Sequence, residues 1–218
     1  MGKGETMGKG ARTRERILEI AEAAVLHKGF AATSIEELIA EAQITKGGFF
    51  YHFKDKNALA RALLQRYIDQ DEAILGRLFD PALDPAREPL EAFLEGLRDF
   101  AVMMEDLPAG HPGCIVAISC YHDRLFDQEV RQLNRQAVLM WRDRFRRILQ
   151  RIADRHPPRK VEDLDALADM VSTVIEGGIV VSKALGRPQV LAEQVRLLGS
   201  FVELAFGPAE EAAGEAVH

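Results

Sequence analysis

The sequence predicts an all-α protein of about nine helices, with three short helices ahead of a larger helical domain. Apolar residues recur at helical spacing in nearly every long segment. β-branched residues rarely alternate with polar ones, so the signals that mark strands are scarce. Pro and Gly stand where these segments end, which is where helices stop.

The helices are expected, in chain order, at about 11–28, 35–42, 45–51, 55–79, 88–105, 114–121, 126–155, 163–185 and 189–206. Gly29 is placed to end the first helix. Ser34 and Glu37, three residues apart, form a capping box that opens the second. Asp55 caps the fourth. Pro and Gly end the last three helices, at Pro157-Pro158, Gly186 with Pro188, and Gly207-Pro208.

Length and composition are those of an ordinary globular protein. The 218 residues are 47% hydrophobic and 28% charged, enough to bury a core without disulfides. No apolar run approaches the ~20 residues that span a bilayer, and residues 1–10 lack the apolar segment of a secretion signal. We expect residues 1–10 to be a disordered tail, residues 208–218 a frayed one, and the location to be cytoplasmic.

The two cysteines, Cys114 and Cys120, are six residues apart and do not make a disulfide framework. Two reduced thiols are the plain interpretation, and a redox sensor is the alternative.

Residues 11–56 fit a helix-turn-helix domain, in which a second short helix enters the major groove while the first holds its angle. The turn falls at Gln43 and Ile44. Residues 57–207 would then form a ligand-binding and dimerisation domain. Residues 1–56 carry nine Lys and Arg against eight Asp and Glu, whereas the whole chain has a net charge of −6. A locally basic head on an acidic body favours binding DNA at one end.

The segment from Thr45 to Lys56 carries the chemistry expected at DNA. Gly47 and Gly48 inside a helix cost roughly 1 kcal/mol each relative to Ala, which makes sense if a DNA backbone or base edge comes close. Lysines pair with phosphates, and backbone N–H groups at helix starts bind them as well. The candidate DNA-binding residues are Thr33, Thr45, Lys46, Gly47, Gly48, Tyr51, His52, Lys54 and Lys56. Lys54 and Lys56 could equally be solvated charges, and Phe49 and Phe53 are core.

Residues 14–60 closely resemble the N-terminal domain of the TetR family of repressors, and the run from Ile44 to Leu59 looks like the family's recognition-helix signature. Two positions depart from the pattern. Phe50 stands where the family often has Tyr, which removes a hydroxyl contact to phosphate. Gln43 stands where the family usually has Gly, which predicts left-handed strain in the turn.

The resemblance implies a helical C-terminal domain with a cavity, where a small apolar or amphipathic ligand changes DNA binding. Met and aromatic side chains suit such a ligand, although each could be ordinary core. The candidate ligand-binding residues are Phe100, Met103, Met104, Cys114, Ile118, Tyr121, Trp141, Phe145 and Glu176.

The last two long helices have more apolar surface than one neighbour needs, so two from each subunit would make a four-helix bundle in a homodimer. The candidate dimer residues are Met170, Val174, Gly177, Gly178, Val181, Leu198, Phe201 and Val202. A two-fold dimer predicts a palindromic operator.

The sequence therefore predicts a ligand-responsive DNA-binding transcriptional regulator, a repressor released from its operator by the ligand. The alternative is a regulator that acts as an activator or without a ligand. No nucleophile elbow, phosphate-cradling loop or paired metal motif is found, so we expect no enzyme, cofactor or metal site. His111, Cys114 and His122 could be assigned to a metal only weakly. The expected partners are double-stranded operator DNA, a small molecule and a second copy of the chain, and no membrane.

Overall fold

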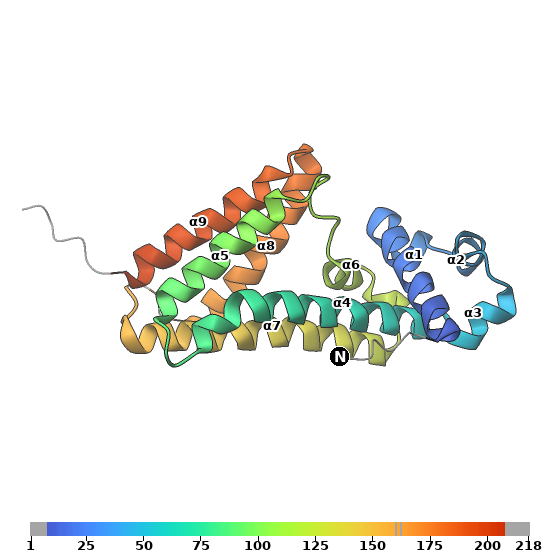
Figure 1. The fold of residues 1–218 in the computed structure, drawn as a ribbon, viewed down its shortest axis with the longest axis horizontal. Helices are drawn as coiled ribbons and strands as arrows, with labels where there is room; N and C mark the ends of the chain where they lie inside the picture. The colour runs from blue at the N-terminus through green and yellow to red at the C-terminus, as the bar shows by residue number, and fades with distance from the viewer. Residues whose placement is uncertain (1–7, 160, 162, 208–218) are drawn as a thin grey trace, which may run out of the picture. The chain divides into compact units, whose positions relative to one another are not determined.

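The computed structural model describes residues 8–159, 161 and 163–207, and within them it contains helices and no strand. This confirms the all-α prediction. The elements are α1 (Lys9–Ala32), α2 (Ile35–Ala42), α3 (Lys46–His52), α4 (Lys56–Phe79), η1 (Asp80–Leu83), α5 (Pro89–Glu105), α6 (Ile115–Tyr121), η2 (Asp123–Leu125), α7 (Gln128–Arg155), α8 (Leu164–Leu185) and α9 (Gln189–Phe206). Figure 1 labels the nine α-helices.

Local signals in the sequence end and begin these helices as expected. Gly29 has a φ of 82°, which interrupts α1 before its last residues. The side chain of Ser34 accepts a hydrogen bond from the backbone N–H of Glu37, and Asp55 accepts one from the N–H of Ala58. Gly186 ends α8 in the left-handed conformation. These residues satisfy backbone groups that a helix end leaves without a partner.

The chain divides into two compact units, and the division falls inside α4, after Glu72, and inside α7, after Leu139. The first unit contains α1 to α3, the start of α4, α6, η2 and the start of α7. The second contains the end of α4, η1, α5, the end of α7, α8 and α9. The predicted DNA-binding domain (11–56) and the predicted ligand-binding and dimerisation domain (57–207) are defined by function rather than by contacts, and they stay predictions.

The first unit is built on the apolar face of α1. Ile17, Leu18, Ala21 and Val25 of α1 are buried, as are side chains of α2, α3 and α4. Phe30, beyond the Gly29 interruption, meets the ring of Phe126 edge to face at 4.8 Å. Burying these side chains holds α2 against α1 and α3 against α2.

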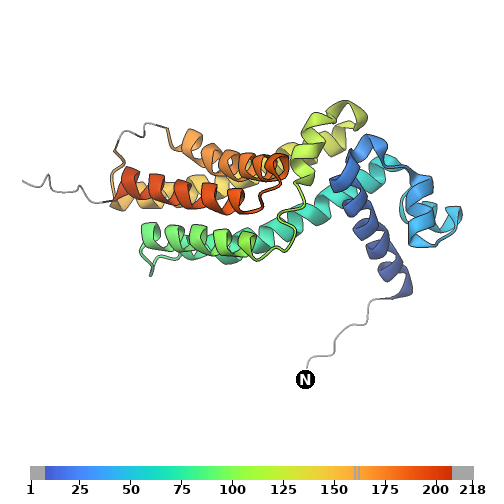
Figure 2. The same ribbon diagram turned by 90° about the horizontal axis from the view of Figure 1, so that it is seen from above.

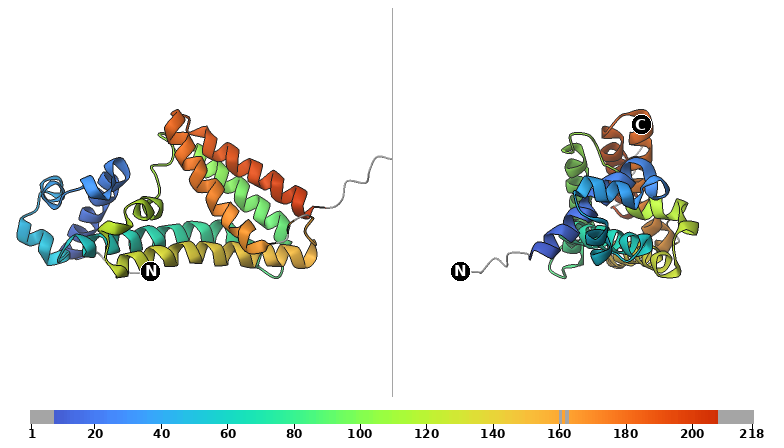
Figure 3. Two further views of the ribbon diagram at one scale, coloured as in Figure 1. Left: turned by 180° about the vertical axis from the view of Figure 1, so that it is seen from behind. Right: turned by 90° about the vertical axis from the view of Figure 1, so that its right-hand side faces the viewer.

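The second unit packs α5 beside α9 and α8 on α9, as Figures 1 and 3 show. Close approach depends on two glycines. A Cβ at Gly178 would lie 2.8 Å from a methyl carbon of Leu191, and one at Gly96 would lie 2.5 Å from the carbonyl oxygen of Leu78. Ion pairs also link helices at the surface. Arg142 of α7 pairs with Asp169 of α8, and Arg196 of α9 pairs with Glu105 of α5.

Candidate nucleic-acid interface

The turn between α2 and α3 is set by Gln43, which has a φ of 52°. The N–H of Gln43 bonds to the carbonyl of Ala40, and the N–H of Ile44 bonds to that of Ile39. A residue other than Gly in this left-handed region is strained, as the sequence predicted. The two hydrogen bonds close α2 tightly, so only three residues separate the end of α2 from the start of α3.

Thr45 starts α3 by capping it. Its hydroxyl accepts a hydrogen bond from the N–H of Gly48 at 3.0 Å. A Cβ at Gly48 would lie 3.3 Å from that hydroxyl oxygen, so Gly48 fits closely against its own cap. A Cβ at Gly47 would meet nothing nearer than 4.0 Å. The fold therefore accounts for Gly48 and leaves Gly47 on an open surface.

One face of α3 anchors the helix in the core. Phe49 and, just after the helix, Phe53 are almost fully buried, and their ring centroids are 5.7 Å apart. Leu38 and Ala42 of α2 are buried with them. This packing fixes the orientation of a helix that is too short to be stable alone.

The opposite face of α3 points to solvent. Tyr51 is 82% exposed, and its ring meets the ring of His52 edge to face at 5.0 Å. Lys46 and Lys54 are exposed at the two ends of the helix. Among the residues that the structure describes, neither lysine forms an ion pair. Two aromatic side chains that can donate or accept hydrogen bonds therefore stand between two free positive charges.

Acidic groups near α3 are occupied elsewhere. The carboxylate of Asp55 caps α4. The carboxylate of Glu37 bonds to the ammonium of Lys28, which lowers the pKa of Glu37. The ion pair with Lys28 offsets the charge of Glu37, whereas Asp55 keeps its negative charge at the start of α4.

Thr33 and Lys56, two of the predicted DNA contacts, are less exposed than Tyr51. Thr33 is 2% exposed, and its hydroxyl donates a hydrogen bond to the carbonyl of Gly29 at 3.0 Å. Its N–H bonds to Phe30, so neither group is offered to a ligand. Lys56 is half-buried, with its ammonium 4.9 Å from the ring centroid of Phe30, and burial lowers its pKa. We leave both residues out of the contact set proposed below.

Residues 17–63, which include all of α2 and α3, match the family model described as bacterial regulatory proteins, tetR family. This segment of the chain belongs to the TetR family. The matched segment starts within α1 and ends within α4, so it includes both helices of the helix-turn-helix and the turn between them.

The chain is similar in sequence to known transcriptional regulators, and the similarity covers different lengths of the chain. The chain is 27% identical to the transcriptional regulator AcuR of Cereibacter sphaeroides over 79% of this chain and 77% of AcuR. It is 36% identical to the transcriptional repressor NemR of Escherichia coli over 25% of this chain and 28% of NemR. Most of the curated relatives are matched over less than two thirds of their own length.

The fold of the whole chain is also that of solved TetR family structures. A TetR family transcriptional regulator from Agrobacterium tumefaciens superposes with a TM-score of 0.75, at 18% identity, over 91% of this chain and 100% of that one. At this identity the likeness shows the fold alone.

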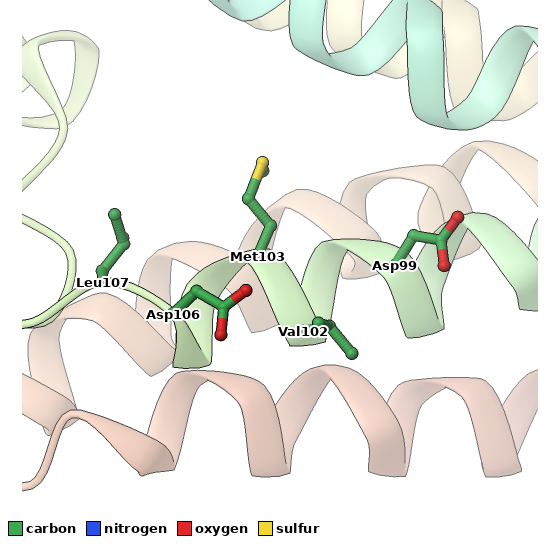
Figure 4. Close-up of a pocket in the computed structure, with 5 residues that line it drawn as sticks. All are labelled: Asp99, Val102, Met103, Asp106 and Leu107. Atoms are coloured by element: carbon green, nitrogen blue, oxygen red, sulfur yellow. The ribbon is translucent and has the colours of Figure 1, made fainter.

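The second unit of this TetR family chain has a cavity of about 500 Å³ along α5. Figure 4 shows its five lining residues, which are Asp99, Val102, Met103, Asp106 and Leu107. Asp99, Val102 and Met103 lie on one side of α5, and Asp106 and Leu107 follow its last residue, Glu105. The guanidinium of Arg77 lies 3.8 Å from the sulfur of Met103. In the described part of the chain, neither aspartate is paired, so the cavity joins apolar surface to two carboxylates.

Of the nine predicted ligand-binding residues, Met103 lines this cavity. Phe100, Met104, Cys114 and Phe145 are buried, and Met103, Ile118, Trp141 and Glu176 are partly exposed. Tyr121 is 84% exposed. Cys114, Ile118 and Tyr121 belong to the first unit and the other six to the second. All nine ligand-binding assignments stay predictions.

The predicted dimer residues of α8 and α9 fall into two groups. Gly178, Leu198 and Val202 are buried inside the chain, so they join α8, α9 and their neighbours within one subunit. Met170 and Val174 are partly exposed, and Gly177, Val181 and Phe201 are exposed. The sequence missed other exposed apolar side chains on the same helices, namely Val180, Leu185, Leu197 and Leu204. An apolar surface of this extent is typical of an interface.

None of the helices within the described residues has the length and apolar character needed to cross a membrane. No group of three His, Cys, Asp or Glu side chains there could hold a metal ion.

Proposed function

We propose that this chain is a ligand-responsive transcriptional repressor, which binds a palindromic operator in the cytoplasm as a homodimer and leaves it when a small amphipathic ligand binds. The proposed DNA contacts are Thr45, Lys46, Gly47, Gly48, Tyr51, His52 and Lys54. The repressor role is supported by the name of NemR, and an activator is the alternative, since the position of the operator decides between them.

The observation that carries the proposal is the two-sided character of α3. Phe49 and Phe53 fix the helix in the core, while Tyr51, His52 and two unpaired lysines face solvent. A recognition helix needs both features, because it must hold its angle while its outer side chains enter a groove. Phosphates pair with the lysines, and base edges are read by the polar aromatic groups.

The proposal is tested by selecting duplexes from a random DNA library with the full-length protein, and then screening for compounds that release the selected duplex. On that duplex, Lys46→Ala and Tyr51→Ala should each raise Kd by at least about fivefold, since a good contact to DNA is worth roughly 1–3 kcal/mol. Fluorescence anisotropy measures the change, and circular dichroism checks the fold.

Tyr121→Ala and Arg135→Ala are matched controls. Tyr121 is as exposed as Tyr51, and Arg135 is an exposed cation of α7. Both should bind the duplex like the unchanged protein. If the two pairs of variants behaved alike, α3 would not be the contact helix. If no duplex were selected, the repressor function itself would be rejected.

The remaining parts of the molecule support the ligand and the dimer. The cavity along α5 suits a molecule with an apolar body and a hydrogen-bond-donating or positively charged end, because Asp99 and Asp106 flank the apolar Val102, Met103 and Leu107. The exposed apolar side chains of α8 and α9 suit a second copy of the same helices, as in a four-helix bundle.

A further inference from the structure

The beginning of α1 carries a basic face that the helix-turn-helix contacts leave unused. Lys9, Arg12 and Arg16 are exposed, and their spacing of three and four residues places them on one face of the helix. None of the three forms an ion pair with any residue the structure describes. In Figure 2 this part of α1, in dark blue, extends past α2 and α3.

The acidic residues of α1 lie on a neighbouring face and gather at one cation. Glu15, Glu19 and Glu22 repeat at four and three residues, and all three pair with Arg66 of α4. Arg66 offsets one of the three negative charges, and the ion pairs hold the carboxylates on the side of α1 that meets α4. The sequence alone, with nearly equal numbers of charges in this region, conceals this separation.

This part of α1 lies beside the end of the recognition helix. A Cβ at Gly10 would be 4.0 Å from the ring of His52. The guanidinium of Arg14 lies over the ring of Phe53, 5.2 Å from its centroid. Along α1 the three basic residues are within one or two turns of Gly10 and Arg14, although they lie on a different face of the helix, which leaves them open to solvent.

We propose that Lys9, Arg12 and Arg16 form a second, sequence-independent contact to DNA, which binds phosphates beside the groove that α3 enters. This inference rests on the proposed function and adds to it. DNA is the partner that fits, because three unpaired cations along one helix face match the regular negative charge of a phosphate backbone. Such a contact adds affinity and salt dependence without adding sequence preference.

The test compares the unchanged protein with Arg12→Gln/Arg16→Gln on the selected duplex and on a duplex of shuffled sequence, from 50 to 300 mM salt. Each lost phosphate contact should reduce the slope of log K against log salt by about 0.9, so the double variant should lose about 1.8. At 0.1 M salt this corresponds to about eightfold weaker binding per contact. The weakening should be equal on both duplexes.

Two further variants separate charge from structure. Arg12→Lys/Arg16→Lys keeps both charges and should restore the slope. Arg98→Gln/Arg135→Gln removes two exposed charges from α5 and α7 and should leave it unchanged. An unchanged slope in Arg12→Gln/Arg16→Gln would overturn this inference while leaving the role of α3 intact. Weakening on the selected duplex alone would also overturn it, because that would mean that these residues read bases. If the unchanged protein bound neither duplex, both proposals would fail.

Discussion

At the scale of single residues, Gly47 and Gly48 show that two neighbouring positions can hold glycine for different reasons. Gly48 is confined by the hydroxyl of Thr45, which caps α3. Nothing in the described residues comes within 4 Å of a Cβ at Gly47 except that same hydroxyl, at 4.0 Å. A glycine that costs helix stability and meets no obstacle inside the protein is consistent with a constraint from outside, which DNA would supply.

Gly47→Ala should therefore separate folding from binding. In the free protein the added methyl group has room and favours the helix, so the free energy of unfolding should rise by up to ~1 kcal/mol. On the selected duplex, Kd should rise about tenfold, because a loss of ~1.4 kcal/mol is expected when the methyl group meets DNA. Urea unfolding and anisotropy measure the two effects. Unchanged DNA affinity would show that DNA does not approach Gly47 closely.

At the scale of helices, α8 and α9 each have two apolar faces. One packs inside the subunit, where Leu198 and Val202 are 2% and 0% exposed. The other contains Phe201, Leu197 and Leu204 on α9 and faces solvent in the single chain. The adjacent residues Phe201 and Val202 therefore differ: Val202 packs within the subunit, and Phe201 lies on the face that we propose meets a second copy.

Phe201→Glu should yield a folded monomer. A two-fold interface places the new charge in the contact twice, and burying unpaired charge is costly, so the dimer Kd should rise by at least a hundredfold. Sedimentation velocity at micromolar concentration measures it. Val102→Glu, which adds the same charge at an exposed apolar position of α5, should stay dimeric. A dimer that persists in Phe201→Glu would place the interface elsewhere.

At the scale of the whole molecule, charge is distributed unevenly along the chain. The net charge is −6, although the first 56 residues are slightly positive. An acidic body repels DNA, so it favours binding through α3 and the start of α1 alone. A homodimer would present two such heads, and its operator should consist of two half-sites one or more helical turns apart.

The stability of the whole molecule should also fall in mild acid because of His111. Burial, and secondarily the charge of Lys183, lower the pKa of His111 to about 4. The unfolded chain binds a proton below pH 6.5 and the folded chain does not until about pH 4, so stability is lost as the pH falls through this window. Between pH 7 and pH 5.5 the loss should be about 1 kcal/mol.

Urea unfolding at these two pH values measures this loss. His111→Gln cannot titrate, so the part of the pH dependence that His111 causes should disappear in that variant. An identical pH dependence in both proteins would contradict the assignment.

Helix positions and their ends follow from neighbouring residues, which is why the sequence predicted them well. Gly29, Ser34, Gln43 and Asp55 act on hydrogen bonds within a few residues, and the apolar period of 3.6 identifies the inner face of each helix. The recognition helix was predicted for the same reason, since Phe49, Tyr51 and their neighbours are contiguous in the chain.

Only the tertiary structure decided which apolar or charged group is covered and by what. Thr33 is buried under its own domain, Gly178 contacts Leu191, and Arg66 gathers three glutamates about 50 residues away in sequence. The periodicity of a helix shows that a face is apolar but does not name its partner. That choice depends on packing between distant segments, so the cavity along α5, the free face of α9 and the basic face of α1 emerge only once the chain is folded.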